Sequence, residues 1–274
     1  MIVTFWGVRG SVPVPGHDTL RYGGNTACVS IEIDGRVLFL DAGMGIRVAG
    51  ETLAVRRREM FIVLSHLHSD HVQGFPYFSP LFDSTMTVHL PDHAHAGRRG
   101  SLLDLLDGVR VPFGRAALRA NLICPQEEAT RHLTSQGWDV ASIALNHPGG
   151  ALGWRVRHAD RSFVHMTDNE LFADEPVTTF DEFVAFCRGA DVLSHDAQWT
   201  SAELAGRDGW GHTSVAQACE LAIAADVRTL VLFHHDPART DDGVDQLCTE
   251  ARRKLQPHGI NCLAASEGLR IELF

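Results

Sequence analysis

The sequence predicts a fold of the mixed α/β (α+β) class, a β-sandwich flanked by helices. Two observations lead to this prediction. Apolar, β-branched runs alternate with helix signatures through the second half of the chain, and residues 1–41 show three short strands separated by turns rich in glycine and proline. Such early hairpins do not fit a purely parallel, doubly wound sheet. We therefore expect two mixed β-sheets with helices outside them.

The predicted strands share one feature, because each apolar run stops abruptly at a polar residue. The runs are 37–40 before Asp41, 61–64 before Ser65, 141–145 before Asn146 and His147, 162–164 leading to Asp168, 191–194 before His195 and Asp196, and 229–233 before His234 and His235. Polar side chains at strand ends can converge in one cleft. The repeated pattern therefore predicts a site built from strand ends.

Helix signatures lie between the later strands. They are Asp181 and Glu182 in the first turn of one helix, Thr213 or Ser214 as the N-cap of the run 215–225, and Asp241 and Asp242 before a helix that stops near Gly259. Residues 75–130 have the least regular pattern. This segment is either a substrate-facing lid or a packed excursion.

Length and composition limit the possible classes of protein. The chain has 274 residues, 45% of them hydrophobic, and no composition shift divides it, so we expect a single domain over residues 1–274. The formal net charge of −10 argues against a broad nucleic-acid surface, which needs many Lys and Arg contacts to phosphate. A small, compact substrate is favoured.

Targeting and redox signals are sparse. Residues 1–6 lack a basic region followed by a long apolar stretch, and no later run approaches membrane-spanning length, so we expect a cytoplasmic protein without a membrane partner. The six cysteines show no paired spacing. We therefore expect buried free thiols rather than disulfides or cysteine ligands to a metal.

The most informative motif is an H-x-H-x-D-H array. Ser65 precedes it, and its four ligand candidates are His66, His68, Asp70 and His71. Imidazole and carboxylate suit zinc, and also iron or manganese. The array directly follows a predicted buried strand, so its histidines should have fixed positions. Alternate side chains of the array could bind two different cations.

Together with the later strand ends, the array resembles the metallo-β-lactamase superfamily, which has an αββα four-layer sandwich. The resemblance spans nearly the whole chain and implies two divalent metal ions, with Zn preferred and Mn or Fe as alternatives. It assigns the ligands as His66, His68 and His147 to one metal, Asp70, His71 and His234 to the other, and Asp168 as a bridge. Asp41 would orient the array. Register and the spacing to Pro237 favour His234 over His235.

Two further motifs resemble the ribonuclease Z-like phosphodiesterase branch of that superfamily. Residues 194–198 (Ser-His-Asp-Ala-Gln) resemble its His-Glu-Ala-Thr box, with Asp in place of Glu, and residues 211–214 resemble its second histidine box. Residues 7–11 and 21–26 resemble a bacterial subgroup described as cyclic-nucleotide phosphodiesterase-like. The acidic chain has no long Gly/Pro-rich arm inserted to grip tRNA, so tRNA is disfavoured as a partner.

The expected reaction is cleavage of a cyclic nucleotide or similar small phosphodiester by a metal-bound hydroxide. Asp70 would bind a metal and accept the proton of the attacking water. His212, oriented by Asp196 or His195, would donate a proton to the leaving alkoxide. The main-chain amides of Thr213 and Ser214 would bind phosphate.

Several alternatives remain open from sequence. Arg9 either clamps a phosphate oxygen or is an exposed turn residue. The rival functions are a ribonuclease Z-like RNA 3′ endonuclease, a lactonase or thioesterase, and a non-catalytic sensor that binds a nucleotide without cutting it. Both a monomer and a homodimer are compatible with the sequence.

Overall fold

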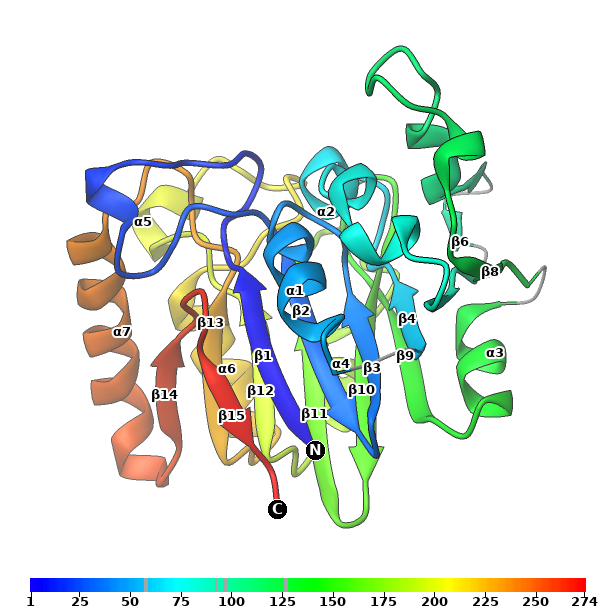
Figure 1. The fold of residues 1–274 in the computed structure, drawn as a ribbon. Helices are drawn as coiled ribbons and strands as arrows, with labels where there is room; N and C mark the ends of the chain where they lie inside the picture. Colours follow the sequence, from blue (N-terminus) through cyan, green and yellow to red (C-terminus); the bar gives the residue numbers. More distant parts are fainter. Residues whose placement is uncertain (57–58, 92, 96–97, 126–127) are drawn as a thin grey trace. The chain divides into compact units, whose positions relative to one another are not determined.

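The chain folds into two mixed β-sheets, each with helices of its own. The computed structural model describes residues 1–56, 59–91, 93–95, 98–125 and 128–274. The chain divides into two compact units, called unit 1 and unit 2 below. Unit 1 comprises Met1–Pro13, Asn25–Gly137 and Ser266–Phe274, and unit 2 comprises Val14–Gly24 and Trp138–Ala265. Figure 1 shows the elements of each unit.

The sheet of unit 1 has, among the described residues, the strand order β15-β1-β2-β3-β4-β5-β8. These strands are β1 (Ile2–Gly7), β2 (Cys28–Ile33), β3 (Arg36–Leu40), β4 (Glu59–Val63), β5 (Thr87–His89), β8 (Asn121–Ile123) and β15 (Arg270–Glu272). From β15 to β3 the neighbours are antiparallel, and from β3 to β8 they are parallel. A separate antiparallel hairpin joins β6 (His93–His95) and β7 (Arg98–Gly100).

Unit 1 also contains short helices and 3₁₀ turns. They are α1 (Gly45–Leu53), α2 (Ser69–Val72), α3 (Ala129–Ser135), and the 3₁₀ turns η2 (Phe75–Tyr77), η3 (Ser79–Phe82), η4 (Leu102–Leu105) and η5 (Arg115–Ala117). Phe75 and Phe78 are fully buried, and Phe78 packs edge-on against Phe39 of β3 at 5.4 Å between ring centroids. The start of the irregular segment 75–130 is therefore packed into the core, and β5 and β8 extend the sheet. Residues 92, 96–97 and 126–127 of that segment lie outside the described residues.

The sheet of unit 2 has the order β14-β13-β12-β11-β10-β9. Its strands are β9 (Asp139–Leu145), β10 (Ala151–His158), β11 (Arg161–Met166), β12 (Val192–Asp196), β13 (Thr229–Phe233) and β14 (Asn261–Ala264). From β9 to β11 the strands are antiparallel, and from β11 to β14 they are parallel. This sheet is therefore also mixed.

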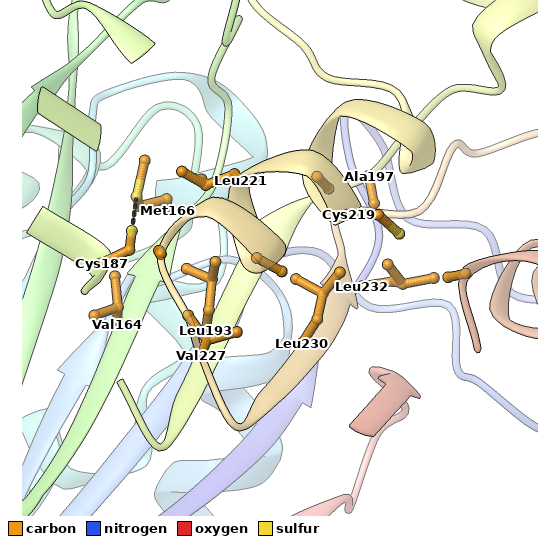
Figure 2. Packing of buried hydrophobic residues seen from close by; sticks show 14 of the residues in the cluster. Val164, Met166, Cys187, Leu193, Ala197, Cys219, Leu221, Val227, Leu230 and Leu232 are labelled. Atoms are coloured by element: carbon orange, nitrogen blue, oxygen red, sulfur yellow. Dashed lines mark hydrogen bonds between the residues drawn. The ribbon is translucent and has the colours of Figure 1, made fainter. Parts of the chain in front are cut away.

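The helices of unit 2 connect its parallel strands. They are α4 (Phe180–Cys187), α5 (Ser201–Leu204), α6 (Val215–Ala224) and α7 (Asp241–Leu255), with the 3₁₀ turns η1 (His17–Thr19) and η6 (Gln256–His258). Figure 2 shows the core, in which Leu221 of α6 belongs to one buried cluster with Leu193 of β12 and Leu230 of β13. Burial of these apolar side chains is the main source of the unit's stability.

The parallel strands bring the polar residues of each unit to one sheet edge. In unit 1, Leu40 pairs with Val63, and the amide of Asp41 donates to the carbonyl of Val63 at 2.9 Å. In unit 2, Met166 pairs with His195, and Asp196 pairs with Phe233. The residues that follow β3 and β4 are therefore neighbours, as are those that follow β11, β12 and β13.

The predicted fold class, two mixed sheets flanked by helices, is confirmed. Of the two N-cap candidates for α6, Ser214 is the cap, and it forms a capping box with Gln217. The helix α7 ends at Leu255, and η6 continues to Gly259, which takes a left-handed φ of 71°. All six cysteines are free thiols, five buried and Cys124 exposed. Within the described ranges, no helix is long and apolar enough to cross a membrane.

Candidate metal centre

The H-x-H-x-D-H array leaves β4 and enters the short helix α2. His66 and His71 are buried, whereas His68 lies on the exposed N-cap of α2. Within unit 1, His66 and His68 offer ligand atoms within 4.8 Å of each other, and Asp70 and His71 do the same. The array therefore presents two ligand pairs from one turn of chain.

Asp41 and Ser65 fix the orientation of two of these histidines. Asp41 takes a left-handed backbone conformation (φ 66°), and its Oδ2 lies 2.8 Å from Nδ1 of His71. The same carboxylate accepts hydrogen bonds from the amide and hydroxyl of Ser65, whose Oγ lies 2.9 Å from Nδ1 of His66. Because Nδ1 of both rings is engaged, Nε2 is the nitrogen that can bind a metal. This is the contact that the predicted orienting role of Asp41 requires.

Asp70 is held by a residue that sequence reasoning missed. The amide of Ser11 donates to Asp70 Oδ2 at 2.7 Å, and the same oxygen lies 3.3 Å from Nε2 of His71. Ser11 also has a positive φ of 64°, which is uncommon for a non-glycine residue. Residues 7–11 matched a motif of the resemblance, but nothing in the sequence pointed to a carboxylate 59 residues away.

Asp168 and His234 form the centre of the polar cluster in unit 2. Both follow strand ends, and both take left-handed conformations, with φ of 48° and 59°. Asp168 Oδ1 lies 3.3 Å from Nδ1 of His234, and its Oδ2 lies 3.9 Å from Nε2 of His147. Residues whose backbone is held in such a sparsely populated conformation cluster at functional sites. All three residues are buried or nearly so.

The neighbouring His235 is used differently from His234. Its Nε2 lies 2.9 Å from the carbonyl of Ala265, and its ring packs edge-on against Tyr22 at 5.8 Å between centroids. His235 therefore connects the end of β13 to Ala265 and Tyr22 within unit 2. His234 lies against Asp168, and its role as the metal ligand of the two stays a prediction.

His147 is oriented by a main-chain carbonyl. Its Nδ1 lies 3.0 Å from the oxygen of Gly211, so Nε2 is again the nitrogen for a metal. Gly211 has a φ of 79°, and a Cβ at this position would lie 2.1 Å from Nδ1 of His147. Both observations require glycine here. Glu170 holds the same loop, because it accepts hydrogen bonds from the amides of Gly209 and Gly211.

His212 and Asp196 form a hydrogen-bonded pair beside these ligand candidates. Nδ1 of His212 lies 2.7 Å from Oδ2 of Asp196, which has no exposed surface. The ring of His212 stacks on His234 at 5.2 Å and meets His147 edge-on at 5.5 Å between centroids. The geometry thus places a carboxylate-oriented imidazole against two ligand candidates.

The two ring nitrogens of His195 have partners other than His212. Its Nδ1 lies 2.6 Å from the carbonyl of Asp196, and its Nε2 lies 3.4 Å from Nδ2 of Asn169. Full burial lowers the pKa of His195 below its ordinary value. Asp196 is therefore the residue that orients His212, and His195 supports the backbone of β12.

The three predicted substrate contacts are placed as follows. The amide of Thr213 points to Oδ1 of Asp196 at 3.4 Å, and the amide of Ser214 donates to Oε1 of Gln217 at 3.0 Å. Both amides are thus engaged inside unit 2, and their role toward substrate stays a prediction. Arg9 is fully buried, which excludes the alternative of an exposed turn residue. Its role as a phosphate clamp also stays a prediction.

The donor sets of both units fit divalent metal ions. Each offers imidazoles in which the other ring nitrogen already has a partner, together with a buried carboxylate. Among the residues that the structure describes, no cysteine belongs to either donor set. Oriented imidazole and carboxylate are ligands that zinc, manganese and iron accept. The charged side chains would be costly to bury without a cation.

Comparison with known proteins agrees with this chemistry. The family described as the β-lactamase superfamily domain matches residues 36–235. Ribonuclease Z of Bradyrhizobium sp. (strain ORS 278) is 26% identical, over 88% of this chain and 91% of the relative. Ribonuclease Z of Pyrococcus abyssi is 22% identical, over 91% and 92% of the two chains.

Solved structures share the fold at lower identity. A diphosphatase of the PhnP family has a TM-score of 0.67 at 18% identity, covering 100% of this chain and 98% of the other. The short form of human tRNase Z has a TM-score of 0.62 at 18% identity, and zinc-bound PqqB of Methylobacterium extorquens has 0.64 at 16%; each covers both chains fully. The chain thus belongs to the β-lactamase superfamily and, within it, to the ribonuclease Z-like branch of metal-dependent hydrolases.

Proposed function

We propose that this protein is a phosphodiesterase that uses two divalent metal ions, preferably zinc, to cleave a cyclic nucleotide or a similar small phosphodiester. The observation that carries the proposal is the pair formed by His212 and Asp196, packed against His147 and His234. Cleavage of a P–O bond needs a proton for the departing alkoxide, and this pair is built to supply one.

The ligands follow the order that the superfamily resemblance implies. His66, His68 and His147 would hold one metal, and Asp70, His71 and His234 the other, with Asp168 between them. When bound, the two cations would lower the pKa of a water molecule and neutralise the charge of the phosphate. Asp41, Ser65 and the carbonyl of Gly211 hold Nδ1 of His71, His66 and His147, so Nε2 of each imidazole would be the metal ligand.

The protein's own groups would move the protons. Asp70, held by the amide of Ser11, accepts the proton of the attacking water. His212 donates the proton of its Nε2 to the leaving oxygen, since its Nδ1 faces Asp196. The buried carboxylate of Asp196 keeps the imidazole in the tautomer and orientation that this transfer needs.

A small substrate is favoured by the charge of the chain. At a formal net charge of −10, the surface repels a polyanion rather than attracting one. A single cyclic phosphate needs only the local positive charge of the metals and a few hydrogen bonds.

A ribonuclease Z-like RNA 3′ endonuclease is the second candidate. It is favoured by the curated relatives, because the ribonucleases Z of Bradyrhizobium and Pyrococcus align over about nine tenths of this chain. The same pair of His212 and Asp196 would serve an RNA diester equally well. The two candidates differ in how the substrate would be bound: a small diester through the metals and a few hydrogen bonds, and an RNA also through charged contacts along its backbone.

The test is product formation, followed by chromatography and phosphorus NMR, with zinc- or manganese-loaded protein. The substrates are 2′,3′- and 3′,5′-cyclic nucleotides, bis-p-nitrophenyl phosphate, a precursor tRNA with a 3′ trailer, a lactone and a thioester. Cleavage of small diesters supports the first candidate. Precursor cleavage that weakens steeply with salt supports the second. Cleavage of the carboxylic esters alone contradicts both.

A further inference from the structure

A cavity of about 670 Å³ lies in unit 1, directly beside the metal-ligand array. It is lined by Met44, Leu67, Ser69, Val72, Gln73, Pro76, Tyr77, Leu105, Arg110 and Val111. Small-molecule sites typically enclose about 300–1,000 Å³, so the cavity can take a ligand the size of a nucleoside. The residues that line it come from the N-cap of α1, the array and α2, the turn η2, and the segment from η4 to residue 111.

The cavity and the array share one stretch of backbone. Leu67 and Ser69 alternate with the ligand candidates His66, His68 and Asp70, and Val72 follows His71. The cavity wall and the ligand candidates of the array therefore belong to one short stretch of chain, residues 66–72. This makes the cavity the candidate site in unit 1 for the part of the substrate that does not react.

The wall is apolar over most of its surface. Leu67, Val72, Pro76, Leu105 and Val111 provide aliphatic contacts. No carboxylate lines the cavity, among the residues that the structure describes. A second phosphate in this place would lose its hydration with little compensation. The wall therefore favours an uncharged group.

One cation lines the cavity, and its charge is already compensated. Nη1 of Arg110 lies 2.9 Å from Oδ2 of Asp107, whose Oδ1 accepts the amides of Val109 and Arg110. These hydrogen bonds lower the pKa of Asp107, so it stays ionised. The pair fixes the loop that carries Arg110 and Val111 without leaving a net positive charge for a second phosphate.

Two side chains of the wall suit a flat heteroaromatic ring. The side chain of Tyr77 is 46% exposed in an otherwise buried turn, so its ring is available for stacking. Gln73 lines the cavity too, and its Nε2 donates to Oγ1 of Thr26 at 3.0 Å. This contact commits Nε2 as a donor to Thr26, so Oε1 is the atom of the amide that can accept from an N–H donor of a ligand.

We infer that this cavity binds the nucleobase of a mononucleotide substrate, with Tyr77 stacking on the base and Gln73 accepting from its exocyclic amino group. The inference rests on the proposed function and narrows it to a nucleoside cyclic phosphate. It makes Tyr77 and Gln73 residues that determine specificity and take no part in the chemical step.

The experiment compares substrates with and without a base. Wild type, Tyr77→Ala and the control Val109→Ala are assayed on 2′,3′-cyclic CMP, 2′,3′-cyclic UMP and the cyclic phosphate of ethylene glycol. Val109 lies in the same loop region as the cavity wall but does not line it, and is 89% exposed. We expect Tyr77→Ala to lower kcat/KM about tenfold on the nucleotides, mostly through KM, and to leave the base-free substrate unchanged.

Gln73 is tested with the matched pair of bases. Cytosine carries an exocyclic amino group where uracil carries a carbonyl, so wild type should prefer cyclic CMP about tenfold and Gln73→Met should lose that preference. Equal losses on the nucleotides and on the base-free substrate in Tyr77→Ala would overturn the inference. So would a wild type that cleaves the base-free substrate as efficiently as the nucleotides.

A binding measurement separates this inference from the proposed function. Saturation-transfer NMR detects cytidine, which has no phosphate, on the wild type and on Tyr77→Ala. If the wild type cleaves no diester but binds cytidine in a manner that Tyr77→Ala abolishes, the proposed function fails and the base site stands. If diesters are cleaved but cytidine binds to neither protein, the base site fails and the proposed function stands.

Discussion

Nδ1 of His212 lies 2.7 Å from Oδ2 of Asp196, and this carboxylate has no exposed surface. Asp196 is the last residue of β12, and His212 lies in the loop before α6, so the sheet itself fixes one partner. The other oxygen of Asp196 accepts from the amide of Gln198 at 3.1 Å. The imidazole is therefore oriented by a buried carboxylate whose two oxygens are both hydrogen-bonded within unit 2.

Replacing His212 with Ala should slow substrates according to their leaving groups. On a 2′,3′-cyclic nucleotide, whose leaving alkoxide needs a proton, we expect kcat to fall about 10²–10⁴-fold. On bis-p-nitrophenyl phosphate, whose leaving group is stable as an anion, the loss should be less than tenfold. Steady-state kinetics on both substrates measure the difference, with His258→Ala, an exposed histidine of η6, as the control. Equal losses on both substrates would rule out the proton-donor role.

Asp41 should determine metal affinity without binding the metal. Asp41→Asn retains a side chain that tolerates the φ of 66° but removes the charge that fixes Nδ1 of His71. We expect zinc affinity to fall about 10–100-fold, measured by competition with a chromophoric chelator. Asp34→Asn is the matched control, because Asp34 also has a positive φ (49°) but lies in a distant turn. An unchanged zinc affinity in Asp41→Asn would contradict the orienting role.

Much of the site could be predicted because its signals are local. The array follows a buried strand directly, and Asp41, Asp168 and His234 each follow another apolar run, so strand and ligand are read from one short stretch. The choice between His234 and His235 also followed from the alternation of side chains along β13. The fold class rested on the same strand pattern.

The remaining contacts join residues that no local pattern connects. Ser11 reaches Asp70 across 59 residues, and the carbonyl of Gly211 reaches His147 across 64. A main-chain donor or acceptor has no identity in the sequence, so these partners could not be found there. The sequence also could not decide whether Asp196 or His195 faces His212. That choice between adjacent residues at a strand end depends on the exact register of the strand.

Gly211 should be irreplaceable for a reason beyond its backbone conformation. In Gly211→Ala the new Cβ would lie 2.1 Å from Nδ1 of His147, so the ring must move and lose its hydrogen bond to the Gly211 carbonyl. Gly206→Ala is the matched control, since Gly206 has the same φ of 79° and a Cβ there meets nothing within 4 Å. Both variants should lose about 1–2 kcal/mol of stability from the left-handed backbone. Only Gly211→Ala should also lose zinc affinity, and equal zinc affinity in the two variants would refute the argument.

The buried pair of His89 and His132 should make stability depend on pH. Nδ1 of His89 lies 3.0 Å from Nε2 of His132, and burial lowers the pKa of His89 below 6.5 although the nearby carboxylate of Glu59 opposes the shift. His89 also stacks on Phe61 at 4.0 Å between ring centroids. Near pH 6 the unfolded chain thus binds more protons at this position than the folded chain.

The free energy of unfolding should therefore be fully developed above pH 6.5 and should decline as the pH falls below that value toward the lowered pKa of folded His89. His89→Gln removes the titrating group, so its stability should decline less between pH 7.5 and 5.5 than that of the wild type. Urea unfolding at both pH values, with zinc held saturating, measures the difference, and the histidines proposed as metal ligands contribute equally to both proteins. His258→Gln, which replaces an exposed histidine, should retain the wild-type pH dependence. If His89→Gln also retains it, His89 is not the group that couples folding to pH.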